Sequence, residues 1–476
     1  MSTAGPAHRV ESAVVEYGYP QGHLGHLTAD EETAFVKFKT FCAEKGYYKP
    51  GAGVDDIPSH DDPLLLRFLR ARRFHVEEAF NQFKDTEDWR KANQLDKLYE
   101  TIDLDEYEET RRLYPQWTGR RDRRGIPVYV FEVKHLNSKT MSAYEKSAVK
   151  THTKAQTDGK TSPKLLRLFA LYENLTRFVM PLSTAMTDRH HPHTPITQSN
   201  NIVDISGVGL KQFWNLRTHM QDASTLATAH YPETLDRIFI IGAPAFFPTV
   251  WGWIKKWFDP ITTSKIFILS HHDVKKTLET FIDPANIPKK YGGGLEFKFG
   301  DLPVLDPHVE KVLEWNGDRK DFPHGPMYWI ENGRGEGVEK IKALAVGSQG
   351  GNERKLDVCV VTKILPEAAA KAATANGHLS VIDEGERSEL LRAPTATPSL
   401  AQTEMNSRPA TQENKVIQDG VLEDASRPEM QTFVTAQEGE LTRLEDLKLS
   451  ENSGPHHTFT ANLLDPNLHV EEEKKI

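Results

Sequence analysis

Three histidines, His190, His191 and His193, are the residues of this sequence most suggestive of metal chemistry. Imidazoles hold zinc when a fixed backbone presents them and further ligands complete a tetrahedron. Here Pro192 and Pro195 predict a flexible, solvated loop, and no cysteine or carboxylate is spaced to complete the coordination. We therefore expect no metal site.

Gly207 and Gly209 form a second candidate, because they follow an apolar run as the first glycines of a dinucleotide-binding loop do. Gln212 replaces the third glycine of that fingerprint, and no acidic residue follows at the distance that would hold a ribose. The sequence also contains no nucleophile elbow, phosphate-binding loop or zinc signature. We expect neither a cofactor nor an enzyme.

Four arginines are concentrated in the stretch LLLRFLRARRF. The preceding residues 61–63, DDP, are typical of a helix start, with an acidic cap and a proline in the first turn. On that helix Arg67, Arg70 and Arg73 lie three residues apart on one face, and Arg72 lies off this row. A basic row of this kind suits either a phosphate or an anionic membrane surface.

The most apolar part of the sequence is Tyr231–Ser270, in which two β-rich runs enclose three of the eight tryptophans. Its uncharged portion is shorter than the ~20 residues of a membrane span and contains two prolines. We predict a helix over Pro248–Phe258 instead, whose apolar stripe consists of Val250, Trp251, Ile254, Trp257 and Phe258. Such a helix either caps the core of an α/β domain or forms a lid over a cavity for an apolar ligand, and the pattern leaves both open.

Composition and periodicity divide the chain into segments. Residues 1–28 mix glycine, proline and histidine and are expected to be a flexible arm, whereas residues 29–100 have the periodicity of an all-helical module. From 101 to 306 strands alternate with helices, which is typical of a mainly parallel α/β sheet. In this part a long helix, Lys164–Met180, is expected to end at Pro181.

The C-terminal third has a different character. Residues 307–366 are expected to be a small extension in which Ile341–Val346 and Leu356–Val361 form a β-hairpin. Residues 367–476 carry 20 acidic and 10 basic side chains, and we predict a disordered acidic tail that offers one weak site for a protein partner. The remaining 366 residues hold 48 acidic and 49 basic side chains, so nothing indicates nucleic-acid binding.

Cysteine usage and the N-terminus favour a cytoplasmic protein. Cys42 and Cys359 are the only cysteines, which suits a reducing compartment. The polar N-terminus has no apolar core of a secretory signal.

Four stretches resemble the CRAL-TRIO lipid-binding family, in the same order along the chain. The N-terminal helical module of that family is similar to DDPLLLRFLRARRFHVEEA with the later Trp89-Arg90-Lys91. The lipid-binding domain of its phosphatidylinositol-transfer branch is similar to HYPETLDRIFIIGAP, WFDPITTSKIFIL and IPKKYGGG. The resemblance covers about residues 30–306. It implies that parallel strands floor a deep apolar cavity, which a movable gate helix over Pro248–Phe258 closes.

The resemblance also implies which residues hold the ligand, a phospholipid. By this resemblance Arg72, Thr262 and Lys265 bind the inositol phospholipid headgroup. Arg73 is expected close by, and Glu233 within reach of the lysine. Arginine and lysine neutralise phosphate, threonine donates from its hydroxyl, and glutamate holds the lysine in the empty site.

The site for a second phospholipid is less complete. The family uses a Ser-x-Thr pair and two tyrosines for phosphatidylcholine. This sequence has Ser199 and Asn201 for the pair, keeps Tyr129, and places Thr118 near the other tyrosine. Phosphatidylinositol is therefore the better-supported ligand, and the second lipid is expected to be another species.

The resemblance implies a monomeric, non-enzymatic protein of the cytoplasm that associates peripherally with Golgi or endosomal membranes. It would transfer or present phosphatidylinositol. The alternative is a lipid sensor or adaptor of the same family, in which the pocket holds another apolar ligand and the C-terminal region recruits partners.

Overall fold

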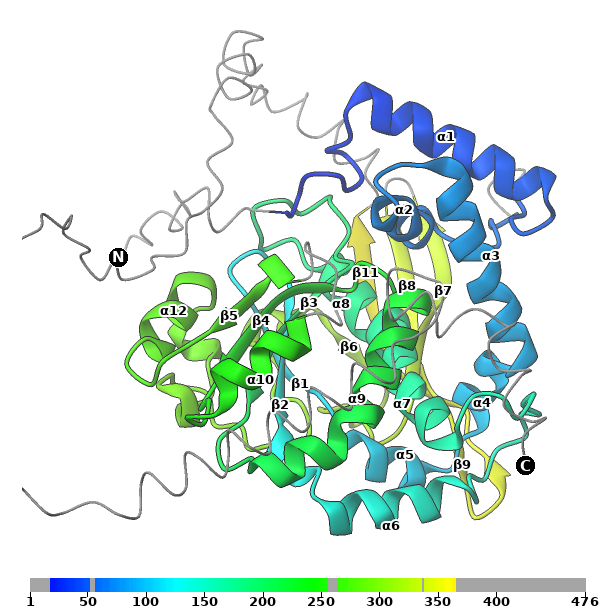
Figure 1. Ribbon diagram of the computed structural model, residues 1–476. Helices are drawn as coiled ribbons and strands as arrows, with labels where there is room; N and C mark the ends of the chain where they lie inside the picture. Colours follow the sequence, from blue (N-terminus) through cyan, green and yellow to red (C-terminus); the bar gives the residue numbers. More distant parts are fainter. Residues whose placement is uncertain (1–17, 52–55, 256–262, 336–337, 365–476) are drawn as a thin grey trace, which may run out of the picture. The chain divides into compact units, whose positions relative to one another are not determined.

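The computed structural model describes residues 18–51, 56–255, 263–335 and 338–364 (Figure 1). The chain divides into two units, Met1–Gly377 and His378–Ile476, and every described residue belongs to the first. The predicted acidic tail and residues 1–17 lie outside the described residues.

The helix that follows Asp61 begins where the sequence predicts. Thr28 and Glu31 form a capping box at the first helix, and Asp61 accepts a hydrogen bond from Leu64 N (2.8 Å) at the second. Phenylalanines and leucines of the first three helices form their common core. The helices of this part are α1 (Ala29–Glu44), α2 (Asp62–Ala71), α3 (Val76–Ala92), α4 (Leu95–Thr101) and α5 (Leu104–Arg111).

Residues Gly18–Thr28, which we call the N-terminal strap, pack against the folded chain. Tyr19 and His23 are 1% and 2% exposed. The Tyr19 hydroxyl donates to the Thr194 carbonyl oxygen (3.1 Å) and accepts from Arg189 Nη1 (2.8 Å). The expected flexible arm therefore does not include the strap, because these two ring side chains find buried partners far along the chain.

A five-stranded sheet of order β1-β2-β3-β4-β5 forms the centre of the α/β part. β1 is antiparallel to β2, and the other neighbours are parallel, so the predicted mainly parallel sheet is confirmed. The strands are β1 (Gln116–Arg121), β2 (Pro127–Glu132), β3 (Ser199–Asp204), β4 (Leu235–Ile241) and β5 (Ile266–Ile268).

One face of this sheet is covered by α12 and the segment that follows it. Val128, Val130, Ile202 and Phe239 pack against Leu278 and Phe281 of α12 and against apolar residues between 282 and 297. The remaining helices of this part are α6 (Ser138–Ala148), α7 (Pro163–Asn174), α8 (Met180–Ala185), α9 (Leu210–His230), α10 (Phe247–Ile254), α12 (Val274–Phe281) and α13 (Pro307–Val312). Short helical turns are η1 (Val133–His135), η4 (Pro284–Asn286) and η5 (Lys289–Tyr291).

The prediction that a helix ends at Pro181 is wrong. α7 continues through a π-helical turn, η2 (Leu175–Val179), into α8. Pro181 lies in the first turn of α8, where a missing N–H costs little. The π turn breaks the regular hydrogen-bond ladder just before the proline and so lets the helix run on.

Residues after 306 form a four-stranded antiparallel sheet in place of an isolated hairpin. Its order is β6-β11-β8-β7, and a two-stranded β9–β10 hairpin follows β8. Its buried face packs on η2 and α8; Trp329 stacks on Phe178 with ring centroids 5.5 Å apart and donates to the Phe178 carbonyl oxygen (2.9 Å). The strands are β6 (Glu314–Trp315), β7 (Met327–Gly335), β8 (Val338–Ala345), β9 (Ser348–Gln349), β10 (Asn352–Glu353) and β11 (Leu356–Ile364).

A buried glutamate joins the N-terminal helices to the sheet domain. Glu173 of α7 accepts from Arg90 Nη1 and Nη2 of α3 (2.6 and 3.0 Å) and from the Tyr231 hydroxyl (2.6 Å). Burial opposes ionisation of Glu173, but Arg90, Arg177 and the Tyr231 hydroxyl outweigh it and lower its pKa to about 2. Tyr231 lies only two residues before Glu233.

Among the described helices none is long and apolar enough to cross a membrane.

Candidate ligand-binding site

Glu233 lies between two cations from distant parts of the chain. Its Oε2 is 2.9 Å from Arg70 Nη2 and 3.5 Å from Lys265 Nζ. We call these three residues the Glu233 cluster. Their side chains are 11% (Arg70), 19% (Glu233) and 15% (Lys265) exposed, so the cluster is shielded from bulk water but still accessible.

The ends of secondary-structure elements position the cluster. Arg70 lies in the last turn of α2, whose start is fixed by the Asp61 cap. Glu233 lies in the turn before β4, and Lys265 immediately precedes β5. Because β4 and β5 are parallel neighbours, the segments that enter them meet at one edge of the sheet. Lys265 Nζ also donates to the Leu235 carbonyl oxygen (3.1 Å).

The backbone at Glu233 is strained. Its φ of 55° places a non-glycine residue in the left-handed region, at a cost of about 1 kcal/mol or more. Arg67, buried in α2, donates to the preceding Pro232 carbonyl oxygen (3.5 Å). The fold thus holds the carboxylate in one place by contacts on both sides of a disfavoured turn.

Two of the five predicted headgroup residues, Glu233 and Lys265, are in contact. Arg72 and Arg73 have exposed side chains just past the end of α2, and Thr262 lies outside the described residues. Arg70 was not among the predicted headgroup residues; only its place in the basic row pointed to a phosphate. The basic row was left open between a phosphate contact and a membrane-facing patch, and the largely buried guanidinium groups of Arg67 and Arg70 do not fit the patch.

His23 of the N-terminal strap completes the surroundings of Arg70. Its Nε2 lies 2.9 Å from Arg70 Nη1, and its Nδ1 lies 3.0 Å from the Gln21 carbonyl oxygen. Burial, followed by the charge of Arg70, holds the pKa of His23 well below its ordinary value. His23 is therefore neutral at physiological pH.

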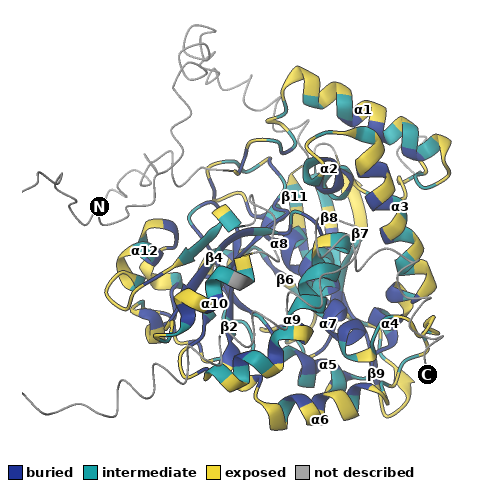
Figure 2. Cartoon of the chain, in the orientation of Figure 1, coloured by how far each residue is buried: buried dark blue, intermediate teal, exposed yellow. Residues whose placement is uncertain are grey.

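The second face of the central sheet is apolar and only partly covered. Cross-strand register places its side chains in two rows, Tyr129–Asn201–Ile238–Ile266 and Phe131–Val203–Ile240–Ile268. Six of these eight side chains are half-buried or exposed in the part of the chain that the structure describes (Figure 2). The Glu233 cluster lies at the edge of the sheet where β4 and β5 begin.

The residues predicted for a second lipid lie on this face. Tyr129 is the direct cross-strand neighbour of Asn201, whose Nδ2 donates to Ser199 Oγ (3.2 Å). Thr118, in the place of the second tyrosine, is buried and its hydroxyl donates to the Val128 carbonyl oxygen (3.0 Å). That hydroxyl is engaged within the sheet.

α10 carries three of the five predicted gate residues. Val250 is buried, Trp251 and Ile254 are half-buried, and Trp257 and Phe258 lie outside the described residues. The Trp251 ring packs near that of Phe247, which is also buried, with centroids 6.2 Å apart.

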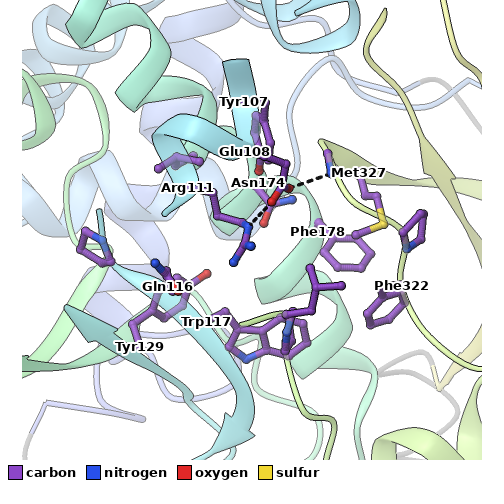
Figure 3. A pocket seen from close by; sticks show the side chains of 16 residues that line it. Tyr107, Glu108, Arg111, Gln116, Trp117, Tyr129, Asn174, Phe178, Phe322 and Met327 are labelled. Atoms are coloured by element: carbon purple, nitrogen blue, oxygen red, sulfur yellow. Dashed lines mark hydrogen bonds and ion pairs between the residues drawn. The ribbon is translucent and has the colours of Figure 1, made fainter. Parts of the chain in front are cut away.

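A small cavity of about 60 Å³ lies where β1 and β2 meet η2 and the C-terminal sheet (Figure 3). Trp117, Tyr129, Phe178 and Phe322 contribute aromatic walls. Glu108 accepts from Arg111 Nε (2.7 Å) and from Gly325 N (3.0 Å); burial opposes its ionisation, yet these contacts keep its pKa below the ordinary value. The cavity has room for a few water molecules.

The histidine loop is packed only in part: His190 and His193 are exposed, as predicted for a solvated loop, whereas His191 is half-buried. His191 lies edge-on to Tyr19 and to His26, with centroids 6.2 and 4.9 Å away, and burial lowers its pKa to about 4. Within the described ranges no three histidine, cysteine, aspartate or glutamate side chains form a group that could hold a metal ion.

Comparison with known proteins agrees with the resemblance noted in the sequence. The CRAL/TRIO domain model matches residues 111–293, and the CRAL/TRIO N-terminal domain model matches residues 34–85. The SEC14 cytosolic factor of Eremothecium gossypii is 30% identical over 273 residues, which cover 57% of this chain and 79% of that protein.

Two other relatives are longer than the matched region. The SEC14 cytosolic factor of Yarrowia lipolytica is 32% identical over 61% of this chain and 54% of its own length. The phosphatidylinositol/phosphatidylcholine transfer protein SFH7 of Arabidopsis thaliana is 35% identical over 50% of this chain and 41% of its own. This chain thus spans about half or less of each of these two.

Proposed function

The chain belongs to the CRAL-TRIO family, and on that premise we propose that it is a non-enzymatic protein that binds phosphatidylinositol and transfers or presents it at cytoplasmic membrane surfaces. The observation that carries the proposal is the Glu233 cluster, a shielded pair of cations around one carboxylate at the edge of a partly uncovered apolar sheet face. An anionic headgroup and acyl chains need these two environments side by side.

The apolar face of the sheet would lower the free energy needed to extract a lipid from a bilayer. A lipid that leaves a bilayer exposes its chains to water at about 0.8 kcal/mol per CH₂, so unaided desorption is very slow. Isoleucine, valine and phenylalanine side chains on the second face of the sheet replace bilayer hydrocarbon with protein hydrocarbon. Trp251 and Ile254 of α10 are apolar enough to close over the chains and to contact a membrane interface.

The cluster would bind the phosphate by partner exchange. In the empty protein Glu233 neutralises Lys265; a phosphate that binds the lysine replaces this carboxylate with another anion. Arg72, Arg73 and Thr262 belong to the same proposed headgroup site. The exposed side chains of the two arginines are free to reach a headgroup or an anionic membrane surface.

The second lipid is proposed to differ from phosphatidylcholine. Tyr129, Ser199 and Asn201 would contact it, but Thr118 offers no ring and its hydroxyl is already bonded to Val128. A lipid pulldown from mixed membranes followed by mass spectrometry tests this proposal. Recovery of phosphatidylcholine together with phosphatidylinositol would contradict it.

Vesicle-to-vesicle transfer of labelled phosphatidylinositol tests the main proposal. The double variant Thr262→Asp with Lys265→Ala is expected to lower the transfer rate about tenfold or more, since charge-assisted phosphate contacts are lost. Lys275→Ala is the matched control, because Lys275 is exposed on α12, where it pairs with Glu279. Absence of transfer by the wild type, or undiminished transfer by the double variant, would refute the proposal.

A sensor or adaptor is the second candidate. Its support is the region after residue 306, which adds a four-stranded sheet to the lipid-binding part. Because that sheet is packed into the core around η2 and α8, a partner would have to recognise its outer face or the tail. Capture of another apolar ligand without phosphatidylinositol transfer would favour this candidate.

A further inference from the structure

The guanidinium group of Arg70 is shared between two partners of different kinds. One terminal nitrogen donates to the Glu233 carboxylate (2.9 Å), and the other donates to the neutral ring of His23 (2.9 Å). The two contacts come from residues 163 and 47 positions away in the sequence. Arg70 is therefore held at the cluster from two directions.

The protonation state of His23 follows from its partners. Arginine has only donors, so His23 Nε2 must accept, and the ring proton resides on Nδ1, which donates to the Gln21 carbonyl oxygen (3.0 Å). A neutral acceptor orients a guanidinium without cancelling its charge. A carboxylate at the same position would have removed that charge from the site.

The strap that carries His23 is anchored on both sides. Tyr19, four residues earlier, is bound by Thr194 and Arg189, and Thr28 begins α1 with its capping box. The Tyr19 and His23 rings also pack edge to face, with centroids 5.0 Å apart. Gly22 has a φ of +70°, and a Cβ there would lie 3.7 Å from Arg70 Nε, so the strap backbone passes directly over the arginine.

The net charge of the Glu233 cluster suits the binding of one anion. Arg70 and Lys265 contribute two positive charges, Glu233 contributes one negative charge, and His23 contributes none. The remaining single positive charge matches the single negative charge of a phosphodiester. Arg70 is the arginine already beside the carboxylate that a phosphate would replace, whereas Arg72 and Arg73 have exposed side chains.

We infer that Arg70 is a direct ligand of the lipid phosphate and that His23 is the positioning residue that fixes Arg70 for this contact. The inference rests on the proposed binding of phosphatidylinositol and deepens it. On arrival of the phosphate, the Arg70 nitrogen that faces Glu233 moves to the phosphate oxygen, and the nitrogen that faces His23 stays in place.

The experiment measures phosphatidylinositol bound per folded protein after incubation with phosphatidylcholine vesicles that contain phosphatidylinositol. Arg70→Gln is expected to lower the apparent affinity about tenfold or more. Arg70→Lys keeps the charge but cannot bridge His23 and the phosphate, so it should lose affinity to a smaller extent.

His23→Phe removes the acceptor, and His23→Gln restores an acceptor and should recover most of the affinity. His26→Phe, an exposed strap histidine away from Arg70, is the matched control.

A double-mutant cycle separates positioning from structural support. In the Arg70→Gln background, His23→Phe is expected to have no further effect on affinity, although its effect on thermal unfolding persists. Loss of affinity by His23→Phe of equal size in both backgrounds would overturn the positioning role. If wild type binds phosphatidylinositol and Arg70→Gln binds it equally well, this inference is wrong and the proposed function stands. If wild type binds none, the proposed function fails, and this inference with it.

Discussion

Replacement of Glu173 by glutamine should measurably loosen the junction between the N-terminal helices and the sheet domain. The carboxylate is 1% exposed and is the shared acceptor for Arg90 and the Tyr231 hydroxyl. Glu173→Gln keeps the shape but leaves the Arg90 guanidinium beside a neutral amide. Loss of one partner from a buried ion pair costs about 3–5 kcal/mol, and we expect about 3 kcal/mol here because the amide oxygen still accepts one bond. Tm should fall by roughly 5 °C.

The pH dependence of this destabilisation tests whether the charge of Glu173 causes it. The folded pKa of Glu173 is lowered to about 2 from an ordinary value near 4.5. Its stabilisation is therefore fully present above about pH 4.5 and is lost as the pH falls from there towards 2. The difference in unfolding free energy between wild type and Glu173→Gln should be constant from pH 7 to about 5 and should shrink below that range.

Urea unfolding followed by tryptophan fluorescence measures this difference. Glu353→Gln is the control, because Glu353 forms an ion pair with Lys154 in which both side chains are half exposed or more, and it should leave unfolding unchanged. Equal stability of Glu173→Gln and wild type at pH 7 would refute the reasoning. A difference that stayed constant down to pH 3 would show that geometry, not charge, is responsible.

Three further predictions concern other parts of the fold. Gly242→Ala should destabilise the protein by about 1 kcal/mol or more in thermal unfolding, because φ is +68° there and a Cβ would overlap Ser206 Oγ; Gly207→Ala, also at positive φ but in open space, should cost less. Trp329→Phe should keep the stack on Phe178 but remove its hydrogen bond, at a cost of about 1 kcal/mol by chemical denaturation. Cys42 and Cys359 are buried, which raises the pKa of each thiol to about 12, so iodoacetamide at pH 8 should label neither until the protein unfolds; rapid labelling of the native protein would contradict this.

The sequence was most informative where structure is local. The Asp61 cap fixed the start of α2, and the apolar runs predicted the parallel strands, because caps and periodicity act over a few residues. Glu233 and Lys265 were placed together only through the family motif, since 32 residues separate them.

Arg70 and His23 could not be recognised in the same way. Nothing in the spacing of LLLRFLRARRF distinguishes an arginine that points inward from one that points outward, and the partner of Arg70 lies 163 residues away. The strap has the composition of a flexible arm, yet two buried rings fix it. The continuation of α7 past Pro181 depends on a π turn, which no residue-type preference predicts.

The connection between β4 and β5 contains both the proposed gate helix and one residue of the Glu233 cluster. β4 and β5 are parallel neighbours, so the chain leaves the sheet at Gly242, carries α10, and returns at Lys265 to the edge at which β4 began. The lysine of the Glu233 cluster is therefore the covalent return point of the same crossover that contains the proposed gate. A headgroup that changed the partner of Lys265 would act on the end of that crossover, so ligand binding and the proposed gate would be coupled through one backbone segment.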